Sequence, residues 1–397
     1  MKAGWEYKTL GKICKIYNGN SINADYKKKH FLGATGGFPF IATKDVSPLG
    51  TIDYNNGVRI PNYEEFKVAP ANSVFICAEG GSAGKKFAYV EKDVCFGNKL
   101  FCITPKDKAI KGKFIYHFVQ SDNFRGQFFS LLTGLIGGVS AKKFQTIEIP
   151  VPSLSEQQSI VDYLDSAFAK IDTMKANAEK ALNEAKALFQ ASLKEMLEPK
   201  EGWEEKKLMD IGELKNGINF NKNESGYNVH ILGVGDFGKL FLIDDTDCLQ
   251  TISLNSNPSE EYILKNEDIV FVRSNGNKNL VGRCVLIHVG EEPCSFSGFC
   301  IRFRKSTNEV DACYLTHFLK TENARKKLVG NGANISNLNQ KVLNEFVVSY
   351  PSISEQQSIV ATLDSLKSKV DRLQENYDKI SQECNALKQA ILRQVFE

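Results

Sequence analysis

Two windows of 46 residues, 153–198 and 352–397, contain neither proline nor glycine, although the chain of 397 residues has 11 prolines and 30 glycines. Inside a helix, proline costs about 3 kcal/mol and glycine about 1 kcal/mol relative to alanine. The windows therefore predict two long helices, each roughly 60–65 Å in length at about 1.5 Å per residue. They divide the chain into four parts, 1–151, 152–199, 200–350 and 351–397.

The two halves of the chain are copies of one another. The decapeptide that begins at Pro152 recurs at Pro351 with nine identical residues in ten, and the tripeptide GWE at 4–6 recurs at 202–204. A period this long indicates two copies of a whole domain plus helix, and not a solenoid of short repeats. The segments between the matching blocks diverge. This divergence favours one scaffold with two different variable surfaces, and drift of an old duplication would give a similar pattern.

The two windows have the pattern of coiled-coil arms. Ser155 and Ser354 are expected to cap the first turn, where Glu156 and Glu355 suit the positive helix end. In the second window, two apolar rows with a seven-residue period predict a coiled-coil seam; they are Leu363, Val370, Tyr377, Cys384, Ile391 and Leu366, Leu373, Ile380, Leu387. The first window has an alanine-rich seam, so packing of the two arms on each other is favoured. We interpret the arms as a rigid spacer, with an ordinary oligomerisation coil as the alternative.

The parts between the arms predict an α+β fold. Short apolar runs that read as strands are separated by turn residues; they are 40–42, 73–77, 100–103 and 147–151 in the first copy, and 269–272, 284–287, 300–303 and 346–348 in the second. One helix per copy is expected after the strands, around 114–129 and 314–329.

The charge of the chain is unevenly distributed. The net charge is +3 overall, but residues 1–151 hold 21 basic and 12 acidic side chains, a difference of +9. The other three parts carry −3, −2 and −1 in chain order. A basic first domain is typical of a polyanion-binding surface, although solvated surface charge would give the same count.

Two polar loop families and one lysine cluster have the residue types that contact nucleic acid. Loop 79–86 corresponds to 273–279, loop 137–143 corresponds to 334–341, and a lysine cluster lies at 27–29. Glycine lets the backbone approach phosphate, basic side chains supply charge, and Arg, Asn and Gln offer paired donors to base edges. Each loop alone is also typical of an ordinary surface turn. The candidate DNA-binding residues are Lys27, Lys28, Lys29, Ser82, Lys85, Lys86, Ser140, Lys142, Lys143, Lys222, Arg273, Asn275, Asn277, Lys278, Asn279, Asn337, Asn339 and Lys341.

Motifs for catalysis are missing from the sequence. It contains no GxGxxG after a strand, no GxxxxGK[ST], no HExxH and no [DNS]PP[YF] signature of amino-methyltransferases. His117 and His317 are expected to pack on their helices rather than to bind a ligand. We therefore predict a non-enzymatic chain without catalytic, cofactor-binding or metal-binding residues.

No apolar run approaches the roughly 18 residues of a membrane span, and the N-terminus lacks the apolar core of a signal peptide. The ten cysteines form no CxxC pair, which favours reduced thiols. These features predict a cytoplasmic protein that does not enter a membrane.

Together these features resemble the specificity subunit of Type I restriction–modification systems over essentially the full length. The resemblance is carried by the doubled GWE, by the doubled PxxSEQQ motif that starts each arm, and by the closing segments LFQASL at 188–193 and LKQAIL at 387–392. It implies two target recognition domains, 1–151 and 200–350, each reading half of a split DNA sequence. It further implies that the arms 152–199 and 351–397 form an antiparallel coiled coil that sets the gap, with a pseudo-two-fold repeat.

The resemblance also implies the partners. These are double-stranded DNA, two modification (methyltransferase) subunits, and a restriction subunit that can join them. S-adenosylmethionine would belong to the methyltransferase, and ATP with magnesium to the restriction subunit, so that this chain holds no cofactor. Two alternatives are a coiled-coil scaffold with two protein-binding heads and a catalytic subunit in its own right.

Overall fold

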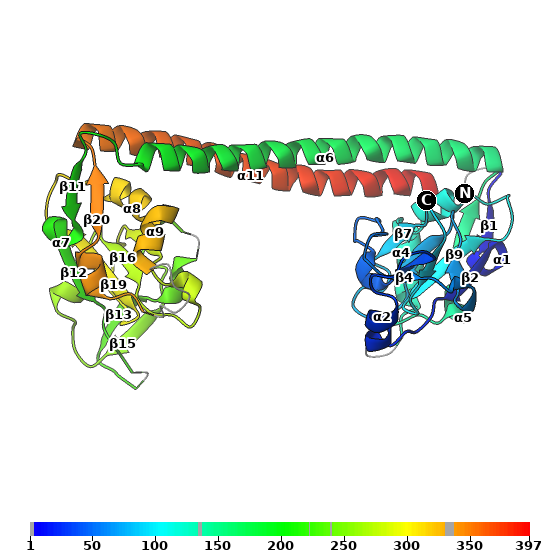
Figure 1. Ribbon diagram of the computed structural model, residues 1–397, viewed down its shortest axis with the longest axis horizontal. Coiled ribbons are helices and arrows are strands. Elements are labelled where there is room, and N and C mark those ends of the chain that lie inside the picture. Colours follow the sequence, from blue (N-terminus) through cyan, green and yellow to red (C-terminus); the bar gives the residue numbers. More distant parts are fainter. Residues whose placement is uncertain (1–3, 134–136, 222, 239, 330–336) are drawn as a thin grey trace. The chain divides into compact units, whose positions relative to one another are not determined.

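The computed structural model describes residues 4–133, 137–221, 223–238, 240–329 and 337–397 (Figure 1). Its contacts divide the chain into two compact units. The first unit comprises Met1–Glu179 and Asn376–Glu397, and the second unit comprises Lys180–Glu375. Because the second unit interrupts the first, each unit contains one globular part together with one end of each long helix.

The first unit contains two four-stranded sheets and a two-stranded ribbon. Its sheets have the orders β2-β9-β6-β7 and β4-β3-β8-β5, and β1 pairs with β10. The strands are β1 (Glu6–Thr9), β2 (Cys14–Asn18), β3 (Phe38–Ile41), β4 (Arg59–Ile60), β5 (Val68–Ala69), β6 (Val74–Cys77), β7 (Phe87–Tyr89), β8 (Val94–Phe96), β9 (Leu100–Pro105) and β10 (Glu148–Val151). The helices of its globular part are α1 (Leu10–Ile13), α2 (Ala24–His30), η1 (Thr43–Asp45), η2 (Tyr63–Glu65), α3 (Gly112–Phe118), α4 (Asp122–Ser130) and α5 (Ala141–Phe144).

The second unit contains a five-stranded and a three-stranded sheet. Their orders are β12-β19-β16-β17-β14 and β15-β13-β18, and β11 pairs with β20. The strands are β11 (Glu204–Lys207), β12 (Gly212–Asn216), β13 (Tyr227–Leu232), β14 (Leu242–Ile243), β15 (Thr251–Leu254), β16 (Ile269–Val272), β17 (Cys284–Ile287), β18 (Cys294–Phe296), β19 (Cys300–Lys305) and β20 (Val347–Tyr350). The helices of its globular part are α7 (Leu208–Ile211), η3 (Val234–Phe237), η4 (Glu260–Tyr262), η5 (Lys278–Leu280), α8 (Ala312–Lys320), α9 (Glu322–Val329) and α10 (Gln340–Asn344).

The two units share one topology. The order β2-β9-β6-β7 recurs as β12-β19-β16-β17, and the parallel pair of β3 with β8 recurs as β13 with β18. The predicted strand runs and the α+β class are confirmed. The central strands β6 and β16 are buried along their whole length, so their sequences are continuously apolar rather than alternating.

The prediction of a single helix after the strands in each copy is wrong, because the structure has two helices there. Ser121 ends α3 and caps α4 by accepting a hydrogen bond from the Phe124 amide at 3.2 Å. Thr321 caps α9 in the same way, accepting from the Ala324 amide at 3.3 Å. A hydroxyl that competes for first-turn amides breaks a helical pattern that apolar periodicity alone reads as continuous.

The two long helices are present as α6 (Leu154–Leu197) and α11 (Ile353–Phe396), each of 44 residues. In each unit they lie side by side (Figure 1). In the first unit, Lys388 Nζ lies 2.6 Å from Asp172 Oδ1, and in the second Lys186 Nζ donates to Gln374 Oε1 at 2.7 Å. Residue numbers rise along one helix as they fall along the other, so the helices are antiparallel.

The residues that begin the arms differ from the expectation. Ser153 and Ser352, not Ser155 and Ser354, accept from the amides of Glu156 and Glu355, at 3.3 and 3.4 Å. The reason is that α6 and α11 start at Leu154 and Ile353, which puts the later serines inside the first turn.

The first glutamine of each repeated Gln-Gln pair also has a structural role. Gln157 is fully buried; its amide donates to Ala109 O and Pro152 O, and its oxygen accepts from Lys111 N. Gln356 makes the same three bonds, to Glu309 O, Pro351 O and Asp311 N. Each arm is therefore bonded at its start to the loop before α3 or α8.

Candidate nucleic-acid interface

Three loops of the first unit meet through main-chain hydrogen bonds. Ala78 N donates to Lys99 O at 2.9 Å, and Val139 N donates to Ala78 O at 3.1 Å. Gly80 N also donates to Gly137 O at 2.9 Å. Residues 79–86, 97–99 and 137–143 thus form one continuous surface, which we call the first three-loop surface.

The second unit builds the same arrangement from different residues. Arg273 N donates to Phe299 O at 2.8 Å, and Leu338 N donates to Arg273 O at 2.7 Å. Residues 273–279, 297–299 and 337–341 form the second three-loop surface. The structure therefore brings together, within each unit, the two loop families that the sequence singled out.

The lysines of the first three-loop surface differ in exposure and in the hydrogen bonds that hold their side chains. Lys85 is exposed and its Nζ donates to Gly81 O, whereas the half-buried Lys86 donates to Thr43 O at 3.0 Å. Lys142 and Lys143 are exposed on α5. Lys85, Lys142 and Lys143 therefore present positive charge to solvent, while Lys86 is tied to a neighbouring loop.

Two candidates on this surface are structural. Ser140 caps α5 by accepting from Lys143 N at 3.3 Å. Ser82 is half-buried, and its carbonyl accepts from Lys85 N at 3.0 Å. Both residues shape the loops that carry the lysines.

The lysine cluster Lys27–Lys29 lies elsewhere, in the last turn of α2. Lys27 Nζ stands 5.3 Å from the centre of the Phe40 ring, and Lys28 and Lys29 are exposed. Among the described residues, no hydrogen bond or ion pair joins α2 to the first three-loop surface. The cluster thus lies on a different element from the other candidates, with the Phe40 ring between Lys27 and the turn at Gly97.

On the second three-loop surface, the polar side chains stabilise the loops that they belong to. Arg273 is half-buried and its Nη1 donates to Gly298 O at 3.2 Å. Asn275 and Asn277 each accept from the amide two residues further on, at 2.7 and 3.1 Å. These bonds hold the loop open in two successive Asx turns.

The remaining candidates of the second unit have mixed positions. Asn279, Asn337 and Lys341 are exposed, and Asn339 caps α10 by accepting from Val342 N at 3.0 Å. Lys222 and the side chain of Lys278 lie outside the described part of the chain.

Sequence reasoning missed the third loop of each surface, 97–99 and 297–299. A signal for it was the pair of matching Asn-Gly dipeptides at 18–19 and 216–217. A Cβ on Gly19 would lie 2.0 Å from Phe96 O, and one on Gly217 would lie 2.1 Å from Ser297 O. These glycines are required because the chain passes directly against the turn that carries the third loop.

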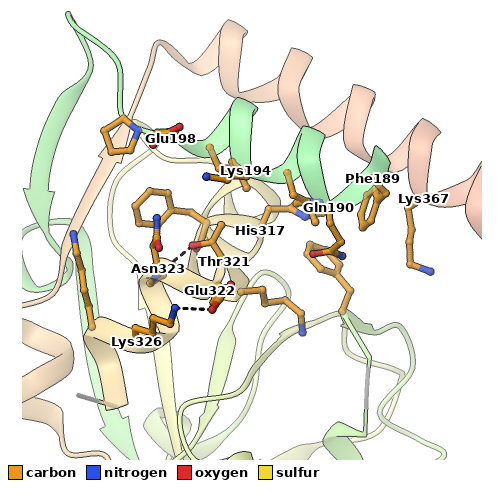
Figure 2. A pocket seen from close by; sticks show the side chains of 18 of the residues that line it. Phe189, Gln190, Lys194, Glu198, His317, Thr321, Glu322, Asn323, Lys326 and Lys367 are labelled. Atoms are coloured by element: carbon orange, nitrogen blue, oxygen red, sulfur yellow. Dashed lines mark hydrogen bonds and ion pairs between the residues drawn. The ribbon is translucent and has the colours of Figure 1, made fainter. Parts of the chain in front are cut away.

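The second unit also has a cavity of about 840 Å³ where α6 and α11 meet α8 and α9 (Figure 2). Phe189, Leu193 and Phe318 contribute apolar walls. His317 lines it and is buried, and its Nε2 has no hydrogen-bond partner among the described residues. Burial lowers the pKa of His317 to about 4.

The equivalent junction in the first unit is bonded differently. His117 Nε2 lies 2.8 Å from Asp165 Oδ1, and Lys113 Nζ lies 2.7 Å from the other oxygen of that carboxylate. The hydrogen bond from His117, together with that from Lys113, lowers the pKa of Asp165 to about 2. In the second unit His317 stands 3.7 Å from Asp364. Both histidines thus face the arm.

In the described part of the chain, no group of three or more His, Cys, Asp or Glu side chains could hold a metal ion. Nor does any described helix combine the length and apolar character needed to cross a membrane.

Comparison with known proteins identifies a family. The model of the Type I restriction modification DNA specificity domain matches residues 2–184 and again 200–382. The StySPI specificity subunit of Salmonella potsdam is 25% identical, with 99% of this chain and 88% of that protein covered. The EcoKI specificity subunit of Escherichia coli K12 is 26% identical with the same coverage.

Solved structures show the same fold. A chain from a study of complex assembly and conformational transition of the Type I R-M system superposes with a TM-score of 0.75 at 18% identity, covering 100% of this chain and 98% of that one. The HsdS subunit from Thermoanaerobacter tengcongensis gives a TM-score of 0.59 at 18% identity, with 100% and 97% covered.

Proposed function

This chain belongs to the Type I restriction–modification DNA specificity family, and from that premise we propose how it selects DNA. It is the DNA target-recognition subunit of such a system and not the catalytic one. The first unit reads one half of a bipartite target and the second unit reads the other half. The chain directs a methyltransferase partner, and a restriction partner where one joins, to that target.

The observation that carries this proposal is the pair of three-loop surfaces. They share the same main-chain hydrogen bonds but present different side chains, lysines in the first unit and mainly asparagines in the second. A constant frame with variable side chains is what two readers of different sequences require. Phosphate contacts would position each unit, and contacts with base edges would supply the specificity.

The arms supply the spacing between the two half-sites. Both α6 and α11 continue from one unit into the other without a break, over 44 residues each. Linking two readers through a stiff element makes the second binding event intramolecular, but only when the gap in the DNA matches the linker. We infer that the coiled coil selects the length of the unspecified gap.

The methyltransferase partners would dock on the arms. Six large apolar side chains of α6 and α11 are exposed to solvent: Leu154, Tyr163, Met174, Leu188, Ile353 and Leu387. Leu188 and Leu387 occupy equivalent positions in the repeat, which supports two copies of one partner. S-adenosylmethionine would belong to that partner, ATP and magnesium to the restriction subunit, and the complex to the cytoplasm.

The experiment that tests this function is co-expression with the methyltransferase partner, followed by single-molecule methylome sequencing. We expect N6-methyladenine within one split motif of two half-sites around a fixed gap. A complex that binds no DNA and leaves no such motif would contradict the proposal and favour a scaffold with protein-binding heads. The isolated chain should show no methyl transfer, since it is the recognition subunit.

A further inference from the structure

The third loop of each three-loop surface is a turn whose last residue is exposed in both units. This residue is Lys99 in the first unit and Phe299 in the second. Each turn is closed by its own hydrogen bond, from Leu100 N to Gly97 O at 3.1 Å and from Cys300 N to Ser297 O at 2.8 Å. The two positions are equivalent in the fold, although the side chain is charged in the first unit and apolar in the second.

Neighbouring segments fix each turn on three sides. In the second unit the bonds run from Ser297 N to Leu232 O (2.9 Å), from Gly298 N to Ile218 O (2.6 Å) and from Arg273 N to Phe299 O (2.8 Å). In the first unit they run from Gly97 N to Ile41 O (2.9 Å), from Asn98 N to Asn20 O (3.2 Å) and from Ala78 N to Lys99 O (2.9 Å). The backbone at Lys99 and Phe299 is therefore held in place from three directions.

Phe299 is 60% exposed in spite of this support. Burial of an aromatic ring away from water lowers the free energy. A turn that is bonded on three sides cannot fold back to bury the ring of Phe299. The backbone of Phe299 is bonded to the loop of Arg273 and Asn275, whose side-chain types can pair with base edges. An apolar group presented rigidly among such side chains suits contact with a base, through the thymine methyl group or as a wedge at a base step.

We propose that Phe299 makes an apolar base contact that determines specificity at one position of the second half-site, whereas Lys99 makes a charged phosphate contact at the equivalent place of the first. This inference rests on the proposed function and adds to it which side chains act and how. The two units thus use one position of a common turn for two kinds of readout. The first unit gains affinity from it, and the second gains sequence discrimination.

The test uses the complex with its methyltransferase partner and four variants: Phe299→Ala, Phe299→Lys, Lys99→Ala and the control Met209→Ala. Met209 is also an exposed apolar side chain of the second unit, but it lies on α7. Methylome sequencing reports the motif. Binding to a duplex that contains the wild-type motif, measured over a range of salt concentrations, reports affinity and the number of phosphate contacts.

Phe299→Ala should relax the second half-site at one position, with about tenfold weaker discrimination there, and leave the first half-site and the salt slope unchanged. Lys99→Ala should keep the motif and reduce the magnitude of the salt slope by about 1. Phe299→Lys should relax the same position and make the salt slope steeper. Met209→Ala should match the wild type.

An unchanged second half-site in both Phe299 variants, in a wild-type complex that does methylate a split motif, would overturn this inference and leave the proposed function intact. Failure of the wild-type complex to bind or methylate any split motif would instead count against the proposed function. Melting temperatures of all four variants, compared with the wild type, distinguish a lost contact from a lost fold.

Discussion

At the scale of single residues, one buried glutamine in each copy explains the structural role of the PxxSEQQ motif. Gln157 and Gln356 each satisfy two carbonyl groups and one amide that the fold takes out of water. Trp5 of the GWE motif donates to Glu156 Oε1 at 2.8 Å, which connects the two repeated motifs of the first unit. These residues hold the arm on its domain, so their repetition reflects structure and not DNA contact.

Replacement of Gln157 by alanine should therefore destabilise the first unit. Three backbone groups would lose their partner, and each buried unsatisfied group costs about 1–3 kcal/mol before water compensates. We expect a loss of about 3 kcal/mol in the free energy of unfolding, measured by urea denaturation. Gln158→Ala is the matched control, because the Gln158 side chain donates to the exposed Asp162 in the next turn. A change of similar size in both variants would contradict the anchoring role.

His317 should make the second unit sensitive to acid. Its pKa falls from 6.5 to about 4 because burial disfavours the charged form, and the Asp364 carboxylate offsets this only in part. The unfolded chain then binds more protons than the folded one between these two values, so stability is complete above pH 6.5 and declines as the pH falls toward 4. At pH 4 this group lowers the free energy of unfolding by about 3 kcal/mol.

Thermal melts of wild type and His317→Phe between pH 7.5 and 4 would measure this effect. The variant should lose less stability on acidification, because phenylalanine fills similar space without binding a proton. Parallel curves for the two proteins would show that other groups govern the acid response.

At the scale of elements, the first three-loop surface combines loops that are separate in sequence. Main-chain bonds join the start of the loop of Lys85 to the segment that leads into α5, which carries Lys142 and Lys143. We expect these lysines to contact the phosphate backbone, so that their contribution to binding by the first unit depends on salt but not on sequence.

The double variant Lys85→Ala, Lys143→Ala should weaken DNA binding without altering the methylated motif. Each lost phosphate contact lowers the magnitude of the salt slope by about 0.9, so we expect a decrease of about 2. Lys170→Ala, Lys180→Ala removes two exposed lysines from α6 and serves as the control. A changed motif in the loop variant would mean that these lysines read bases.

At the scale of the whole molecule, the arms and the globular parts have separate roles. In the proposed function the arms determine the spacing of the half-sites and the three-loop surfaces determine their sequence, so a change in one should leave the other intact. This separation follows from a duplication in which the motifs at the start of the arms stayed nearly identical while the loops diverged.

Insertion of one heptad into both arms, after Glu179 and after Glu375, tests this separation. Seven residues add about 10 Å of helix and keep the seam in register. At about 3.4 Å per base pair, the gap of the methylated motif should lengthen by about 3 base pairs with both half-sites unchanged. A heptad in α6 alone should disturb the pairing of the helices and abolish methylation, whereas an unaltered gap after the double insertion would contradict the spacing role.

The sequence alone predicts the repeat, the two long helices and the α+β domains, because the helices and domains rest on local properties and the repeat on direct sequence identity. Absence of proline and glycine, a seven-residue apolar period and short apolar runs act within a few turns of the chain. It also indicated the loops around Lys85 and Arg273, whose residue types suit DNA.

Only the tertiary structure decided which loops share a surface. The bonds that join residues 78, 99 and 139, or 273, 299 and 338, link positions that no short-range pattern connects. The burial of Gln157 likewise depends on the folded chain. Long-range main-chain pairing places Phe299 and Lys99 at the same point of two diverged copies, and that pairing exists only once the chain has folded.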